Sequence, residues 1–272
     1  MATRWGICSA GKISHDFTVA LKTLPAEDHQ VVAVAARNLE DAEEFSRKHN
    51  ISKAYGGYEE LFIFNFETLQ YLLFYIKLFL ISREVKMVRA DFGVPLLNVP
   101  RSVQKELGGG ALLDLGIYCL QFINMVYNGE KPESIQASGI CLETGVDETV
   151  AVNLKYSENR LATFTCSAGV QLHNDAIIGG TKGTIQVPSP MWCPTSLVVN
   201  GKETQYPVPE PYLRLNFTNS TGMRYEAEEV RQCLLKGLKE SPVMSHSDSL
   251  LLIELEDEIH RQVGVVHSQD CQ

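Results

Sequence analysis

RWGICSAGKIS (residues 4–14) and VVAVAAR (31–37) decide the fold of this chain. The first segment reads as a short strand, a Gly-containing turn and the start of a helix. The second is a continuous apolar run of the kind that is buried on both faces of a parallel sheet. A helix over 39–49 and a short extended segment at 54–55 follow. This β-α-β-α order predicts a doubly wound α/β domain at the start of the chain.

The turn after the first strand stands where a dinucleotide fold carries its phosphate loop. Gly11 can bring backbone N–H groups and a helix N-terminus close to a pyrophosphate. The glycine spacing is incomplete, because Ser9 occupies the place of the first turn glycine and Ser14 that of the third. A plain β-α turn therefore stays an alternative to a cofactor loop.

The second strand ends in Arg37. A fold that selects NAD usually carries Asp or Glu there, on the ribose 2′-hydroxyl. A guanidinium suits a 2′-phosphate instead, so Arg37 favours NADP over NAD. The alternative is an ordinary surface arginine.

GGGALLDLGIYCLQF (108–122) is a Gly-rich bend that leads into an apolar helix. Asp114 and Tyr118 are spaced i, i+4, so they share one face of that helix. In the structural interpretation the two groups satisfy each other or nearby backbone inside a core. In the functional interpretation Tyr118 transfers a proton to or from a substrate oxygen, and Asp114 orients either Tyr118 or the substrate. That role requires a nearby cation to lower the pKa of the phenol from about 10.

The second half of the chain has the pattern of a strand meander with covering helices. Short connectors at Glu158-Asn159 and Thr181-Lys182 predict antiparallel hairpins. We expect residues 1–84 to form a partial, NADP-binding Rossmann-like domain and residues 85–272 an open-faced, mainly antiparallel α+β domain. The expected strands are 85–93, 134–142, 148–156, 160–168, 172–180 and 183–187; one expected helix is striped by Met223, Ala227, Val230, Leu234 and Leu238, the other by Leu251, Leu255, Ile259 and Val263.

Residues 61–81 interrupt the expected alternation of strands and helices. They are almost wholly apolar, with Glu67 and Lys77 as the only charges, and show neither a helical nor a strand period. A membrane span has the right length, but the two charges and the absence of a flanking Lys/Arg asymmetry disfavour it. A buried helix and a foreign insertion are the other interpretations.

Composition narrows the possible partners. The chain has 272 residues, a net charge of −9 and a pI near 5.3, which gives no basic field for nucleic acid. Its seven cysteines are scattered without metal-ligand spacing, and no metal site is expected. Reduced thiols and an N-terminus without a signal-like region lead us to expect a cytoplasmic protein.

Taken together, these segments resemble the glucose-fructose oxidoreductase/inositol dehydrogenase (Gfo/Idh/MocA) family. The resemblance covers roughly residues 1–61 and 87–272 and includes ETGVDETV, FTCS, GTKGTIQ and WCPT. It implies an N-terminal Rossmann domain, a C-terminal open-faced sheet and a homodimer. It further implies NADP-dependent oxidation of trans-dihydrodiols of arenes to catechols and of D-xylose to its lactone.

The resemblance also implies roles for individual residues. Tyr118 takes the position of the catalytic acid/base, and Asp114 that of an active-site carboxylate. Arg37 takes the 2′-phosphate contact, whereas position 41, where a second arginine is usual, is Asp. The phosphate loop corresponds to Ser9, Gly11, Lys12 and Ile13.

One departure from the family is larger. The family carries a Glu-Lys-Pro segment whose lysine is the cation that lowers the tyrosine pKa, and no Glu-Lys-Pro occurs between residue 61 and the Gly bend at residue 108. The 61–81 tract stands where about half of the nucleotide domain is expected. Two hypotheses follow: a working NADP-dependent dehydrogenase, or an impaired isoform or mis-assembled gene product that keeps only the dimerisation role of its second domain.

Overall fold

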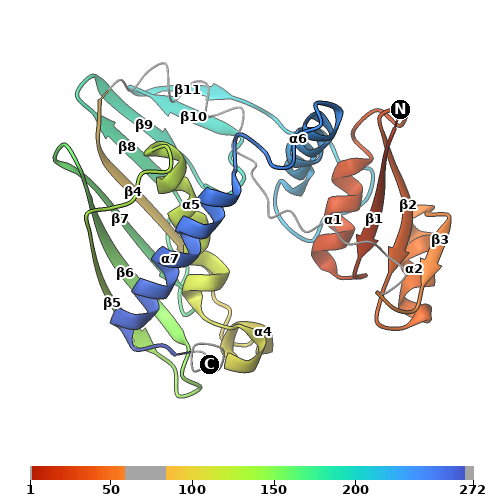
Figure 1. Ribbon diagram of the computed structural model, residues 1–272, viewed down its shortest axis with the longest axis horizontal. Coiled ribbons are helices and arrows are strands. Elements are labelled where there is room, and N and C mark those ends of the chain that lie inside the picture. Colours follow the sequence, from red (N-terminus) through yellow and green to blue (C-terminus); the bar gives the residue numbers. More distant parts are fainter. Residues whose placement is uncertain (1, 59–83, 267–272) are drawn as a thin grey trace. The chain divides into compact units, whose positions relative to one another are not determined.

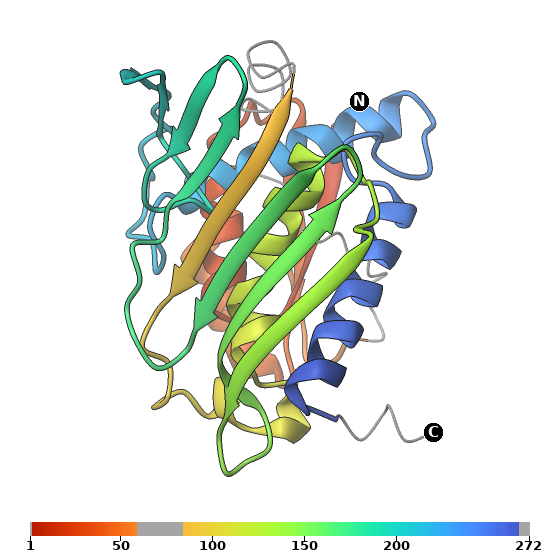
Figure 2. The same cartoon turned by 90° about the vertical axis from the view of Figure 1, so that its left-hand side faces the viewer.

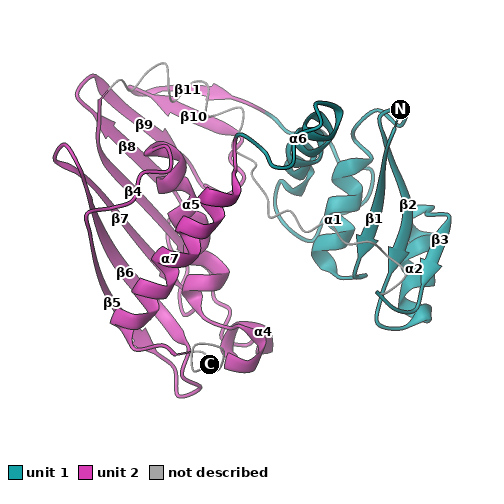
Figure 3. Ribbon diagram, in the orientation of Figure 1, with its two compact units in different colours: residues 1–72, 207–242 teal, residues 73–206, 243–272 magenta. Residues whose placement is uncertain are grey.

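The computed structural model divides the chain into two compact units (Figures 1 and 3). It describes residues 2–58 and 84–266, so the expectations for 61–81 lie outside the described residues. One unit contains a short parallel sheet and the other a large, mainly antiparallel sheet, which confirms the predicted fold class. Unit 1 comprises Met1–Leu72 and Pro207–Pro242; unit 2 comprises Leu73–Tyr206 and Val243–Gln272.

Unit 1 begins with the β-α-β-α order that the sequence predicts. Three parallel strands pair in the order β1-β2-β3, and their apolar side chains form a core with Phe45 of the second helix. Helix α2 is capped at its N-terminus by the Asn38 side chain, which accepts from the Asp41 N–H. The elements are β1 (Thr3–Cys8), α1 (Lys12–Leu21), β2 (His29–Ala35), α2 (Leu39–His49) and β3 (Lys53–Tyr55).

A late segment of the chain completes unit 1. The 3₁₀-helix η3 (Ser220–Met223) and helix α6 (Arg224–Leu235) both pack on α1. The buried Asp16 carboxylate accepts hydrogen bonds from the backbone N–H groups of Asn216 and Phe217, each at 2.9 Å. A single boundary at residue 84 would assign this segment to the second domain, whereas the structure groups Pro207–Pro242 with the N-terminal strands.

Unit 2 is built on an eight-stranded sheet of order β11-β10-β9-β8-β4-β7-β6-β5. Only β4 and β7 pair in parallel; the other neighbours are antiparallel. Glu158 and Asn159 both have positive φ, as a tight hairpin turn requires. The strands are β4 (Val85–Gly93), β5 (Ser134–Cys141), β6 (Asp147–Tyr156), β7 (Arg160–Ser167), β8 (Ala176–Gly180), β9 (Gly183–Val187), β10 (Ser196–Val199) and β11 (Lys202–Gln205).

Helices cover one face of this sheet. Figure 2 looks onto the sheet, and α5 (Ile117–Val126) and α7 (His246–Val263) lie behind it. Helix α5 packs on β4 and β7, and α7 packs on β5. The stretch Lys105–Val126 is long and apolar enough to span a membrane, but 72% of its most apolar window is buried, which is typical of a core helix. Within it lie the 3₁₀-helix η1 (Lys105–Leu107) and the π-helical turn η2 (Leu112–Gly116); α4 (Pro100–Val103) precedes them.

Candidate functional site

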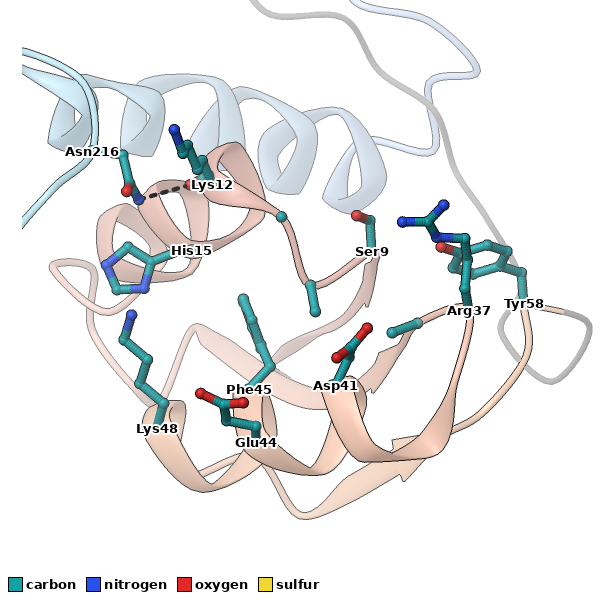
Figure 4. A pocket seen from close by; sticks show the side chains of 13 residues that line it. Ser9, Lys12, His15, Arg37, Asp41, Glu44, Phe45, Lys48, Tyr58 and Asn216 are labelled. Carbon is teal, nitrogen blue, oxygen red and sulfur yellow. Dashed lines mark hydrogen bonds between the residues drawn. The ribbon is translucent and has the colours of Figure 1, made fainter. Parts of the chain in front are cut away.

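A pocket of about 430 Å³ opens in unit 1 around the turn between β1 and α1 (Figure 4). Three cationic side chains and two carboxylates line it, so its rim is charged with both signs. Arg37, Asp41 and Tyr58 gather at one end, and His15, Lys48 and Asn216 at the other. The lining residues are Ser9, Ala10, Gly11, Lys12, His15, Ala36, Arg37, Asp41, Glu44, Phe45, Lys48, Tyr58 and Asn216.

The turn itself has the conformation of a glycine loop although serine stands in it. Ser9 has a φ of +91°, a region that L-residues other than glycine rarely adopt. Its N–H bonds the Ala35 carbonyl at 2.8 Å, which ties the turn to the end of β2. Gly11 is the N-cap of α1 and offers no side chain to the first N–H groups of that helix. These donors are therefore available to an anion, as the phosphate-loop interpretation requires.

Arg37 lies two residues beyond the end of β2 and is exposed on the pocket. Asp41 lines the same end, where its side chain accepts from the Asn38 side chain at 2.8 Å. A cation and an anion thus share the end of the pocket where the sequence predicts a 2′-phosphate contact. The carboxylate opposes a bound phosphate, while the guanidinium favours one.

His15 closes the other end of the pocket and was not singled out from the sequence. Its Nδ1 lies 2.8 Å from His49 Nε2, and its Nε2 lies 3.0 Å from the Arg214 carbonyl oxygen. A carbonyl only accepts, so His15 Nε2 carries a proton and, in the neutral ring, Nδ1 accepts from His49. His49 Nδ1 then accepts from the Tyr212 hydroxyl at 3.1 Å. Burial, with His15 and two lysines nearby, lowers the pKa of His49 to about 4.

Asp114 and Tyr118 lie in unit 2, on consecutive turns of one helical segment. Asp114 falls in the π-helical turn η2 and Tyr118 in the first turn of α5. The Asp114 side chain is 7% exposed, and its Oδ1 bonds Arg101 Nη1 at 2.8 Å. Its Oδ2 is buried and has no hydrogen-bond partner among the described residues. Sequence reasoning missed Arg101 as the partner of Asp114; only its place at the start of α4, before the Gly bend, could have suggested it.

Tyr118 is 41% exposed, unlike the apolar residues around it on α5. Its ring meets Phe92 edge-on, with ring centroids 5.3 Å apart. Phe92 in turn stacks on Trp192 at 4.0 Å with an interplanar angle of 9°. The phenol therefore sits beside a stacked pair of rings, the buried Phe92 of β4 and Trp192 from the segment before β10. Asn174 joins these two segments, because its side chain accepts from the Gly93 N–H at 2.7 Å and its carbonyl from the Met191 N–H at 2.9 Å; no local pattern reveals this link.

The structure brings together four of the five expected cofactor residues. Ser9, Gly11, Lys12 and Arg37 line one pocket, whereas Ile13 is exposed in the first turn of α1 and does not line it. Among the residues that the structure describes, no group of three or more His, Cys, Asp or Glu side chains could hold a metal ion.

Comparisons with known proteins agree with this geometry. A family model for the GFO/IDH/MocA C-terminal domain matches residues 84–186. The chain is 55% identical over 334 residues to trans-1,2-dihydrobenzene-1,2-diol dehydrogenase from Danio rerio, with 100% of both chains covered. It is 41% identical over 332 residues to the protein of that name from Homo sapiens, with 99% of each covered. Both alignments are longer than the 272 residues of this chain, so these relatives contain residues that it lacks.

Solved structures show the same fold at low sequence identity. An NAD binding oxidoreductase from Klebsiella pneumoniae superposes with a TM-score of 0.75 at 15% identity, covering 98% of this chain and 100% of that one. Levoglucosan dehydrogenase, in complex with NADH and levoglucosan, gives 0.75 at 14%, covering 97% and 98%. The family model, the full-length relatives and the fold agree, and the chain belongs to the Gfo/Idh/MocA family of oxidoreductases.

Proposed function

We propose that this chain is an NADP-dependent dehydrogenase that oxidises trans-1,2-dihydrodiols of arenes to catechols and D-xylose to D-xylonolactone, with Tyr118 as the proton-transfer residue. The observation that carries this proposal is the half-exposed Tyr118 phenol beside the stacked rings of Phe92 and Trp192. Aromatic side chains beside the phenol offer apolar contact area to a six-membered carbocycle. The full-length identity to dihydrodiol dehydrogenases supports the same substrate class.

In the proposed reaction the carbinol C–H bond breaks and its electron pair leaves as hydride, while the hydroxyl proton passes to Oη of Tyr118, which reacts as the phenolate and then releases that proton to solvent. NADP, when bound, supplies the hydride acceptor. The resulting ketone regains aromaticity by moving a ring proton to oxygen, which gives the catechol. Asp114, one helical turn before Tyr118 and paired with Arg101, orients Tyr118 or the diol.

For the cofactor, we assign the adenosine phosphates to the unit 1 pocket. Ser9, Gly11 and Lys12 offer backbone N–H groups and a cation at the N-terminus of α1, and Arg37 offers a guanidinium to the 2′-phosphate. The residues present therefore fit the phosphate half of NADP. The described N-terminal part of unit 1 runs to Tyr58 and contains three parallel strands. We assign none of the residues of unit 1 to the nicotinamide.

Turnover of the purified chain tests the proposal. We expect NADPH to form with trans-1,2-dihydrobenzene-1,2-diol and with D-xylose, and catechol to appear in equal amount to NADPH from the diol. A soluble, folded chain that forms no NADPH with either substrate would reject the proposed activity.

A second candidate is a catalytically impaired isoform or mis-assembled gene product that keeps only the dimerisation role of its second domain. Two observations favour it: the sequence has no Glu-Lys-Pro between residue 61 and the Gly bend at residue 108, and the dehydrogenase relatives contain residues that this chain lacks. Loss of a general acid/base contribution lowers a rate by roughly 10²–10⁴.

Calorimetric titration with NADP separates the two candidates, because an impaired chain binds the cofactor weakly or not at all. Micromolar binding would contradict impairment at the cofactor site, and its absence would support it. For the working dehydrogenase we further propose a cytoplasmic homodimer, as the family resemblance implies. Light scattering on the purified chain tests the dimer.

A further inference from the structure

Asp147 is a fully buried carboxylate that no step of the proposed reaction uses. It is the first residue of β6, and its Oδ2 accepts a hydrogen bond from the Leu112 N–H at 2.6 Å. Leu112 is the first residue of the π-helical turn that carries Asp114 and leads into Tyr118. A charged acceptor therefore holds the N-terminal end of the active-site helix at a distance typical of strong hydrogen bonds.

A β-bulge aims Asp147 at this helix. Along β6 the buried residues alternate at positions 150, 152, 154 and 156, so regular alternation would place residue 148 inward. The register instead shifts between Ile140, which pairs with Thr149, and Cys141, which pairs with Asp147. Glu148 is the extra residue, and Asp147 takes the inward place. Bulges beside active sites commonly redirect a side chain in this way.

The second carboxylate oxygen of Asp147 is enclosed as tightly as the first. His260 of α7, itself buried, places Nε2 3.4 Å from Asp147 Oδ1. Gly110 has a φ of +131°, and a Cβ built there would lie 2.5 Å from the same oxygen. The carboxylate thus links the Gly bend, the start of the helix and α7, three segments that are distant in sequence.

We propose that Asp147 is a positioning residue: its carboxylate, which accepts from the Leu112 N–H and lies beside His260, fixes the first turn of the helix so that Asp114 and Tyr118 keep their places at the substrate. Its importance for catalysis rests on the function proposed above. The positioning itself is a property of unit 2 and can be measured without cofactor or turnover.

Fluorine NMR of the chain labelled with 3-fluorotyrosine tests the positioning, with the Tyr118 resonance identified by its loss in Tyr118→Phe. In Asp147→Ala we expect that resonance to shift and broaden, while the Tyr127 and Tyr156 resonances keep their places. Hydrogen exchange at the Leu112 amide should become at least about tenfold faster, because its charged acceptor is gone. Val152→Ala, a truncation of a buried residue on the same strand, is the matched control and should leave both signals unchanged.

Two milder variants keep the proposal testable if Asp147→Ala fails to fold. Asp147→Asn keeps an oxygen for the Leu112 N–H, and His260→Gln keeps the carboxylate, so each should give a Tyr118 change of the same sign but smaller. A folded Asp147→Ala with an unchanged Tyr118 resonance and unchanged Leu112 exchange would overturn the proposal, as would an equal change in Val152→Ala. If the wild-type chain turns over the diol, Asp147→Asn should lower kcat and leave the KM for NADP unchanged.

Discussion

The two candidate half-sites are held in place by different means. In unit 1 the pocket is lined by exposed charged side chains around a short turn, among them Arg37, Asp41 and Lys48. In unit 2 the side chains of Asp114 and Asp147 are almost or fully buried. A charge on an exposed side chain contributes little to the free energy of folding or binding, because solvent screens it. Removing the partner of a buried polar group costs more free energy, because that group is left without a hydrogen bond. Substitutions in unit 2 should therefore have larger effects than substitutions in unit 1.

Two tyrosines of unit 2 test this contrast within one structure. Tyr118→Phe should lower turnover by roughly 10²–10⁴ with little change in thermal stability, because it removes the proton-transfer group from a half-exposed ring. Tyr127→Phe should do the reverse. The Tyr127 hydroxyl donates to the Leu161 carbonyl at 2.8 Å, and burial raises its pKa to about 12, so it holds structure and exchanges no proton near neutral pH.

Steady-state rates and melting temperatures of both variants check this prediction. The expected stability loss for Tyr127→Phe is about 1 kcal/mol. Equal turnover in the wild type and Tyr118→Phe would show that Tyr118 does not transfer the proton. It would not contradict the fold of unit 2.

The glycines of the bend give the next largest effect. Gly110→Ala should destabilise unit 2 by about 2–3 kcal/mol, because φ is +131° and the new Cβ would meet Asp147 at 2.5 Å. Gly108→Ala is the control: φ is also positive, at +69°, but nothing lies within 4 Å of its Cβ. It should cost about 1 kcal/mol. Urea unfolding followed by Trp192 fluorescence in a Trp5→Phe background measures both, and equal losses would show that backbone strain alone, without Asp147, controls the bend.

The sequence predicts what depends on local pattern. VVAVAAR was expected as a buried parallel strand and forms β2, and the turn at Glu158-Asn159 makes the hairpin of β6 and β7. The same local logic finds Ser9, Gly11, Lys12 and Arg37, because a β-α turn gathers residues that are near in sequence. Their roles stay predictions.

Features that depend on register or long-range contact could not be predicted. Asp147 faces inward only because the bulge shifts the alternation of β6 by one residue. The strand expected over 172–180 begins only at Ala176. Asn174 lies before it, and its side chain accepts a hydrogen bond from the Gly93 N–H at the end of β4. Leu234 and Leu238, expected on the apolar stripe of a helix, are exposed. No spacing rule predicts that residues 207–242 join unit 1.

In unit 1 the largest expected effect is that of Arg37. Arg37→Ala should weaken NADP binding about tenfold and leave NAD binding unchanged, because only NADP carries the 2′-phosphate that the guanidinium contacts. Calorimetric titration with both cofactors provides the comparison within one experiment. An equal loss for both would place Arg37 away from the 2′-position.

The stability of unit 1 should depend on pH through His49. Burial, reinforced by His15, Lys22 and Lys48, lowers its pKa from 6.5 to about 4. Between these values the unfolded chain binds more protons than the folded one, so stability is greatest above about 6.5 and falls as pH falls toward about 4. Trp5 reports on unit 1 alone once Trp192 is replaced by Phe. In that background, unfolding midpoints should fall less steeply with pH in His49→Gln; equal slopes would contradict the prediction.

Asp41 should give the smallest effect, and its sign is opposite to that of Arg37. Asp41→Asn removes a carboxylate from the end of the pocket that holds Arg37 but keeps an oxygen for the Asn38 side chain. NADP affinity should rise about two- to threefold, because a single exposed charge interaction contributes less than about 1 kcal/mol. Glu43→Gln, an equal charge change on the same helix away from the pocket lining, should leave affinity unchanged. An equal gain in both variants would mean that net charge attracts the cofactor; a gain in Asp41→Asn alone would place the 2′-phosphate between Arg37 and residue 41.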